Sequence, residues 1–141
     1  RMSLQETARV LLSRALFFRA LFLARRTHPR LSCNLPVQIL SEHTHSLGLV
    51  VDFCKGGMGF IMPDNLKKGC LVSIQLTLKN PELSLNAEGR IIVKEQITDH
   101  DWSYGVSFTK LTRSQKKNIL EVLMHIRIQR RIKEFNISFR H

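Results

Sequence analysis

Two short groups of residues in this chain have the chemistry to bind an anionic ligand. The first contains Arg26 and Arg30, two guanidiniums separated by three residues, and the second is the turn at 52–57, which begins with Asp52 and ends with Gly57. Guanidinium forks pair bidentately with phosphate oxygens and with the O6 and N7 acceptors of guanine. A carboxylate only accepts hydrogen bonds, so it suits the N1–H and N2–H donors of guanine. Together the groups suit a ligand that carries phosphates and guanine edges.

Each group taken alone also has an ordinary explanation. Two arginines at this spacing are common in solvated basic linkers, and Gly56 with Gly57 is common in a β-turn that carries a surface Asp52. Glycine permits left-handed backbone and lets a ligand approach the chain closely, but a turn needs the same freedom. The binding hypothesis therefore depends on the two groups occurring together and on the elements around them.

The composition is that of one folded, basic domain. The chain has 141 residues, 43% of them hydrophobic, which is enough for a core in about one ordinary domain. Lys and Arg number 22 against 11 Asp and Glu, for a formal net charge of +11. Such a balance favours anionic partners, namely nucleotides, nucleic acid or an acidic membrane surface, without choosing among them.

The cysteines and the apolar segments indicate a cytoplasmic protein. Cys33, Cys54 and Cys70 form no CxxC pair and show no metal-ligand spacing, so reduced thiols and no metal site are expected. No signal peptide is evident, and the apolar run 10–24 contains Arg14 and is shorter than the roughly 20 residues that cross a bilayer. A membrane-proximal position stays open.

The chain is expected to begin with a helix. Residues 4–24 are rich in Leu, Ala, Arg and Phe and lack Gly and Pro, and Pro29 disfavours continuation of the helix. Apolar residues occupy most of its circumference, so it is expected to pack against something. Residues 1–24 thus form an N-terminal helix, which either covers its own domain or mediates oligomerisation.

The middle of the chain is expected to be antiparallel β-structure. Alternation of apolar and polar residues, or short apolar runs, predicts six strands at 35–39, 48–54, 58–62, 72–78, 85–97 and 102–108. Turn residues separate them at 45–48, 63–65, 80–81 and 99–101. Because no helical pattern intervenes, a barrel or a sandwich is favoured, with Trp102 and Tyr104 in its core.

The last segment is expected to be a long amphipathic helix with a basic polar face. Thr112 and Gln115 match a capping box, and the helix should run to about residue 135. Its apolar residues follow at four-residue spacing with others beside them: Leu120, Met124, Ile128 and Ile132, and then Ile119, Leu123 and Ile126. Pairing through the two terminal helices would make a homo-oligomer.

With the strand pattern, the two groups make the sequence resemble the PilZ family of bacterial receptors for cyclic di-GMP. That family carries RxxxR followed by DxSxxG or NxSxxG on a six-stranded antiparallel barrel with a C-terminal helix. Arg26 and Arg30 match the first motif, and Asp52, Cys54 and Gly57 match the second. Segments 87–93 and 104–108 are similar to the later strands of the family. The resemblance covers about residues 25–125, and it implies a PilZ-type barrel domain with its C-terminal helix at 25–141.

The resemblance implies a role for each matched residue. Arg26 and Arg30 would contact the phosphates and guanine faces, with Arg25 adding charge, while Asp52 and position 54 would bind a guanine edge. Gly57 would keep the turn open. The family usually has Ser at the position of Cys54, and a thiol is a weaker hydrogen-bonding group than a hydroxyl. Since a typical hydrogen bond contributes about 1 kcal/mol net, the exchange weakens binding several-fold or marks a member that has lost it.

The expected function is therefore a non-catalytic cyclic di-GMP receptor that couples binding to a conformational or interaction change. It would use no cofactor, and its downstream protein partner is not defined by the sequence. One alternative is a degenerate PilZ-like adaptor that no longer binds the nucleotide. Another is a basic barrel that binds nucleic acid, although the strands lack exposed aromatic residues interleaved with basic ones. No motif of an enzyme is present.

Overall fold

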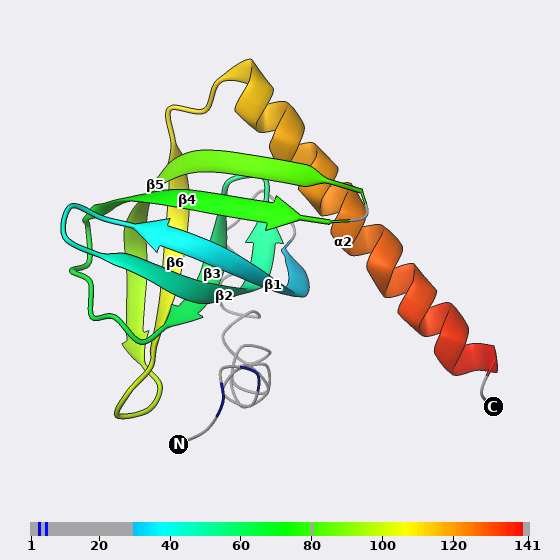
Figure 1. Ribbon diagram of the computed structural model, residues 1–141, viewed down its shortest axis with the longest axis horizontal. Coiled ribbons are helices and arrows are strands. Elements are labelled where there is room, and N and C mark those ends of the chain that lie inside the picture. The colour runs from blue at the N-terminus through cyan, green and yellow to red at the C-terminus, as the bar shows by residue number, and fades with distance from the viewer. Residues whose placement is uncertain (1–2, 4, 6–29, 80, 140–141) are drawn as a thin grey trace.

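The described part of the chain is a six-stranded antiparallel barrel followed by one long helix (Figure 1). The computed structural model describes residues 3, 5, 30–79 and 81–139. The elements are β1 (Leu31–Leu40), β2 (His45–Cys54), β3 (Gly57–Met62), β4 (Leu71–Leu78), β5 (Leu83–Gln96), β6 (Trp102–Thr109) and α2 (Arg113–Phe139). The predicted barrel and C-terminal helix are confirmed. The helix predicted at 4–24 falls outside the described residues apart from Gln5.

The barrel closes in the strand order β1-β2-β3-β6-β5-β4. The closing pair is short, because β1 and β4 are in register only where Gln38, Ile39 and Leu40 lie opposite Gln75, Ile74 and Ser73. The helix α2 contacts β5, β1 and β2. Figure 1 shows it running obliquely past the end of the barrel, with its C-terminal part projecting away from the strands.

Alternating side chains fill the barrel interior as the period of a strand requires. In β4 the residues Val72, Ile74, Leu76 and Leu78 are buried, and the residues between them are exposed. Aromatic rings complete the core: Phe60 stacks on Tyr104 with ring centroids 5.3 Å apart, and Phe53 lies tilted against Phe108 with ring centroids 5.9 Å apart. The prediction that Tyr104 is a core residue is confirmed, whereas Trp102 is only half-buried.

The first hairpin differs from the sequence prediction. A turn was expected at 45–48, but β2 already begins at His45, and the turn lies at 41–44, closed by the Ser41 N–H donating to the Thr44 carbonyl at 2.8 Å. Polar residues can continue a strand on the outer face of a barrel when they find partners there. His45 has one, since its Nε2 lies 3.2 Å from Oε1 of Gln38 on β1.

The capping box at the start of α2 is confirmed. The Gln115 N–H donates to Oγ1 of Thr112 at 3.1 Å, and the Thr112 N–H donates to Oε1 of Gln115 at 2.8 Å. The side-chain amide of Gln115 also donates to the Asn86 carbonyl at 2.9 Å, which ties the helix start to β5. These bonds satisfy donors that a helix N-terminus otherwise leaves open.

The apolar residues of α2 do not form a single buried face. The side that packs on the barrel consists of Ile119, Val122, Leu123 and Ile126, all at most 5% exposed. The row spaced by four residues lies in solvent instead, with exposures from 47% to 63%: Leu120, Met124, Ile128 and Ile132. The barrel covers one side of the helix only, so this second row of apolar residues is left exposed.

Candidate ligand-binding site

Arg30 and Asp52 meet on the outside of the barrel, where β1 begins and β2 approaches its end. Ser32 lies opposite Asp52 in the β1–β2 pair, and Arg30 precedes that pair by two residues. Phe53 points into the core and is fully buried, so its neighbour Asp52 projects from the opposite face of the strand. The two predicted site residues are thus brought together by strand pairing.

A β-bulge precedes Asp52 and sets the direction of its side chain. Between β2 and β3 the register runs from Val50 opposite Phe60 directly to Asp52 opposite Gly59, which leaves Val51 as an extra residue. Bulges of this kind bend a strand locally and re-aim the side chains that follow. The bulge therefore places the Asp52 carboxylate over Gly59.

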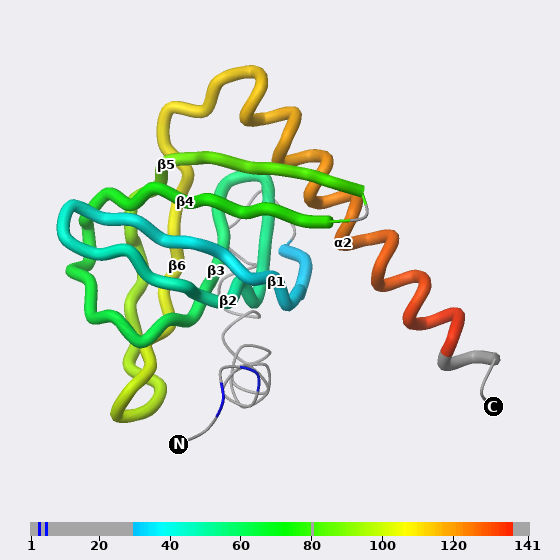
Figure 2. Tube along the Cα trace, viewed as in Figure 1, coloured from blue at the N-terminus to red at the C-terminus, as the bar shows by residue number. Residues whose placement is uncertain are grey.

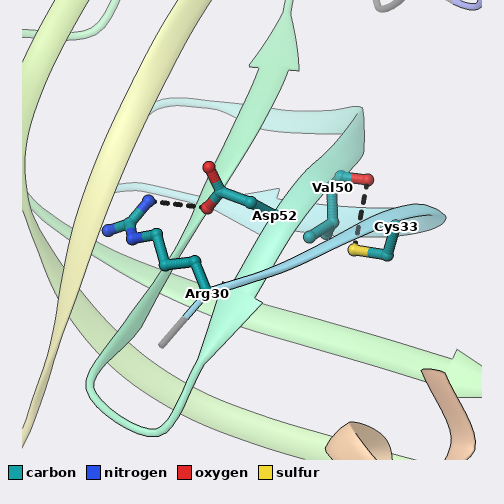
Figure 3. Close-up of polar contacts among 4 residues, drawn as sticks. All are labelled: Arg30, Cys33, Val50 and Asp52. Atoms are coloured by element: carbon teal, nitrogen blue, oxygen red, sulfur yellow. Dashed lines mark hydrogen bonds and ion pairs between the residues drawn. The ribbon is translucent and has the colours of Figure 1, made fainter. Parts of the chain in front are cut away.

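The two side chains form a short ion pair (Figure 3). Nη1 of Arg30 donates to Oδ1 of Asp52 at 2.6 Å, and the side chains are 10% and 19% exposed. A charge-assisted bond of this length is among the stronger hydrogen bonds in proteins. Arg30 therefore lies against the barrel in this structure.

The rest of the Arg30 guanidinium is buried without an acceptor. Its Nε and Nη2 atoms have no hydrogen-bond partner within the described residues. A buried donor that lacks a partner costs about 1–3 kcal/mol, and such groups are rare in folded proteins. The Nε–Nη2 edge of Arg30 is the edge that pairs bidentately with a planar or phosphate acceptor.

Two glycines beside the pair have different roles. A Cβ on Gly59 would come within 2.9 and 3.0 Å of the two Asp52 carboxylate oxygens, so Gly59 leaves room for that carboxylate. A Cβ on Gly57 would lie 1.9 Å from the Val106 carbonyl oxygen, which no side chain tolerates. Gly57 is thus required by the close approach of β3 to β6, and neither it nor Gly56 adopts a positive φ. The left-handed backbone that glycine was expected to supply here is not used.

Cys54 lies two residues beyond Asp52 and is 3% exposed. Cys33, Cys54 and Cys70 are not joined in disulfides. The nearby thiol of Cys33 contacts the Val50 carbonyl at an Sγ–O distance of 3.7 Å (Figure 3). The Cys54 thiol is thus buried in this structure, and its burial by itself does not indicate a role in ligand binding.

The structure thus joins part of the predicted site and adds one residue to it. Arg30 and Asp52 converge, Cys54 and Gly57 lie close by in the same hairpin, and Arg25 and Arg26 fall outside the described residues. Sequence analysis did not identify Gly59 as a site residue, because nothing in the local sequence of β3 indicates that this glycine faces a carboxylate. Only the β2–β3 register reveals that contact.

Other kinds of site find no support in the described residues. Across 30–79 and 81–139, no three His, Cys, Asp or Glu side chains are grouped so that they could hold a metal ion. None of the helices described there has the length and apolar character needed to span a bilayer.

Solved structures similar to this one share its barrel. They include the PilZ domain of YcgR with c-di-GMP from Escherichia coli, at 16% identity and a TM-score of 0.67, covering 78% of this chain and 97% of that one. The inhibitor of motility MotI/DgrA from Bacillus subtilis has 15% identity and a TM-score of 0.62 over 76% of this chain. The MrkH–c-di-GMP complex from K. pneumonia has 13% identity and a TM-score of 0.60 over 77% of this chain.

The chain spans only about half of MotI/DgrA and MrkH, 53% and 55% respectively. Identities this low show a shared fold and no more. A comparison with curated protein sequences found no match. A comparison with family models is decisive, because the model of the PilZ domain matches residues 24–125, which is most of the chain and includes both motifs. The chain belongs to the PilZ domain family.

Proposed function

We propose that this protein is a non-catalytic receptor for cyclic di-GMP. The observation that carries the proposal is the Arg30–Asp52 pair, whose guanidinium is buried with Nε and Nη2 unpartnered. Membership of the PilZ family supports it, as do the similar structures of YcgR and MrkH that are described with c-di-GMP. The net charge of +11 favours an anionic ligand in addition.

The pair offers complementary hydrogen-bonding groups to one guanine. The unpartnered Nε–Nη2 edge of Arg30 has two parallel donors, which would match O6 and N7 of guanine or two oxygens of a phosphate once the groups that bury this edge give way to the ligand. The Asp52 carboxylate has about four acceptor sites, of which Arg30 occupies one, so it can also accept from N1–H and N2–H. Because the ion pair already exists, both groups are held in place before the ligand arrives.

The remaining motif residues complete the proposed site. Arg25 and Arg26 supply further cations for the phosphates, and Cys54 lies at the guanine edge next to Asp52. Gly57 maintains the hairpin on which Asp52 is mounted. Ligand binding would favour one arrangement of the segment before Arg30 relative to the barrel, to the extent that the two arrangements differ in affinity. That preference is the proposed signal to a partner.

Calorimetric titration of cyclic di-GMP tests the proposal with three proteins: the parent, Arg30→Ala and Arg113→Ala. Two charge-assisted bonds at about 1.5–3 kcal/mol each predict that Arg30→Ala lowers affinity at least about 100-fold. Arg113 is exposed at the start of α2, so its variant removes the same charge and should bind like the parent. No heat with the parent, or equal affinities of the parent and Arg30→Ala, would reject the proposal.

The degenerate adaptor remains the second candidate, and Cys54 is the observation that favours it. If the thiol only weakens a receptor, Cys54→Ser should raise the affinity for cyclic di-GMP by up to about tenfold, one hydrogen bond's worth. If neither the parent nor Cys54→Ser binds in the same titration, the adaptor is the correct reading.

A further inference from the structure

The helix α2 carries two apolar rows on opposite sides. The row Ile119, Val122, Leu123 and Ile126 packs on the barrel. At about 100° per residue, the four exposed residues 120, 124, 128 and 132 are centred roughly opposite this row. We call them the outer ridge: Leu120, Met124, Ile128 and Ile132, at 50%, 63%, 49% and 47% exposure. Contiguous apolar residues on a protein surface are typical of interaction sites.

The position of the outer ridge leaves it accessible to a partner. Ile126 is the last residue of α2 buried against the barrel, and the helix continues from Arg127 to Phe139. That extension is about 20 Å of helix at 1.5 Å per residue. Figure 2 shows the coloured part of this extension projecting away from the barrel. The second half of the ridge therefore lies on a free-standing stretch of helix.

The shape of the outer ridge suits another helix. Residues spaced by four form one of the ridges by which helices interlock, and such a ridge fits a groove between side chains of a partner helix. Basic residues interrupt it, because Lys117 and Arg131 lie three residues from Leu120 and Ile128 on the same side, while Phe135, 62% exposed, adds an apolar residue on that side beyond Ile132. A helix that inserts into a lipid surface needs a broad apolar face instead.

The net charge of α2 indicates the charge that a partner of the outer ridge should carry. In α2 there are seven cations (Arg113, Lys116, Lys117, Arg127, Arg130, Arg131 and Lys133) and two anions (Glu121 and Glu134), which gives 7 − 2 = +5. A second copy would place +5 against +5. The segment 1–29 of this chain has the same sign, with six arginines and one glutamate. Because like charges repel, neither a second copy nor the segment 1–29 is a favourable partner, whereas a partner with acidic residues beside its apolar groove would be attracted.

We infer that the outer ridge docks against an amphipathic helix of a partner protein. The ridge fits the groove between apolar side chains of that helix, and Asp and Glu line the groove. The ridge supplies four apolar anchors at i, i+4, i+8 and i+12, and Lys117, Arg127 and Arg131, which lie on the same side of the helix, pair with the acidic rims. Helix-in-groove recognition works through anchors of this kind. The inference does not depend on whether the barrel binds cyclic di-GMP.

Two designed peptides of about 28 residues test it, both with Leu and Ile at the a and d positions of four heptads. One has Glu at all e and g positions and the other has Lys. Fluorescence anisotropy of each labelled peptide is measured against the full chain without cyclic di-GMP. The Glu peptide should bind, less tightly at higher salt, and the Lys peptide should bind at least tenfold more weakly.

The variant Met124→Gln/Ile128→Gln removes the middle of the outer ridge and keeps the helix propensity and charge. It should weaken binding of the Glu peptide at least tenfold. Leu71→Gln is the matched control, since Leu71 is an apolar residue of similar exposure, 45%, that belongs to β4 and not to the helix, and it should bind like the parent. Thermal unfolding of all three proteins should coincide, because each replaced side chain is exposed.

Several results would overturn the inference. One is that the parent does not bind the Glu peptide, or that the ridge variant binds it as well as the parent. Light scattering that shows a dimer of the parent, lost in the ridge variant, would make a second copy the occupant. Retention on vesicles of phosphatidylglycerol and phosphatidylcholine, lost in the same variant, would make it a lipid surface.

Discussion

Tyr104 and Arg30 are two buried polar groups that the fold treats in opposite ways. The Tyr104 hydroxyl donates to the Asp64 carbonyl at 2.5 Å and accepts from the Leu66 N–H at 2.8 Å, in a residue that is 1% exposed. The Arg30 guanidinium has one bond, to Asp52, and two buried nitrogens without a partner among the described residues.

Under the proposed function, the difference separates a structural polar group, Tyr104, from one that serves a ligand, Arg30. Tyr104 fastens the loop between β3 and β4 to the barrel, and its bonds offset the cost of burying a hydroxyl. The buried nitrogens of Arg30 lack such bonds, so the cost of burying them is not offset and Arg30 contributes less to stability than its burial suggests. Proteins keep unfavourable features such as an unpartnered buried donor mainly at functional sites. The variants below test that separation.

The largest contrast is expected from removing the ion pair in the variant Arg30→Met/Asp52→Asn. Cyclic di-GMP affinity should fall at least about 100-fold, because two or more charge-assisted bonds are lost. The free energy of unfolding should change by less than about 1 kcal/mol, since replacing both partners of a buried pair is often neutral. Calorimetry and urea denaturation measure the two effects. A loss of stability above about 3 kcal/mol would show the pair to be structural.

Tyr104→Phe is expected to behave in the opposite way. It leaves the Asp64 carbonyl and the Leu66 N–H without their partner, so the free energy of unfolding should drop by about 1–3 kcal/mol. Affinity for cyclic di-GMP should stay within about twofold of the parent, a difference below about 0.5 kcal/mol. The same two measurements apply. A large loss of affinity in a variant that remains folded would break the distinction drawn above.

Gly59→Ala probes the site without touching either charge. Its Cβ would crowd both Asp52 oxygens at 2.9–3.0 Å, so the carboxylate must shift away from Arg30. We expect about a tenfold loss of affinity, equivalent to about 1.4 kcal/mol, and a small change in the unfolding free energy. Gly69→Ala is a useful comparison, because that glycine has a φ of +92° and nothing within 4 Å of its Cβ position. It should cost stability through backbone strain and leave affinity unchanged.

The smallest effect is expected from pH. The pKa of Tyr104 is raised above 10.0, chiefly because burial penalises the phenolate, while the hydrogen bond from Leu66 opposes the rise. Above about pH 10 the unfolded chain loses this proton before the folded one, so the unfolding free energy falls, by at most about 1.4 kcal/mol per pH unit. The excess stability of the parent over Tyr104→Phe should therefore shrink from about pH 10 upward and be constant below about pH 9.

The chain has a single tyrosine, so phenolate absorbance reports on Tyr104 directly. The folded protein should titrate at higher pH than the chain in urea. Identical titration curves in the two conditions would mean that the hydroxyl is not buried as the structure shows.

Local sequence pattern accounted for much of the fold. The alternation in β4 reproduces its burial residue by residue, and Thr112 with Gln115 located the helix start correctly. Patterns fail where a choice depends on distant partners. The turn at 45–48 was misplaced because His45 finds Gln38 across the hairpin. The sequence also left open which apolar residues of α2 are covered, because nothing local distinguishes the exposed row from Ile119 and its neighbours.

By itself, the amino-acid sequence determined the strands, the final helix and the residue types of the candidate site, because periodicity and capping act within a few residues. Only the tertiary structure decided that Arg30 meets Asp52, that Gly59 clears space for the carboxylate, and which row of α2 is covered. The physical reason is register. A bulge of one residue turns a side chain to the other face of a strand, and long-range pairing, not local preference, sets where the bulge falls.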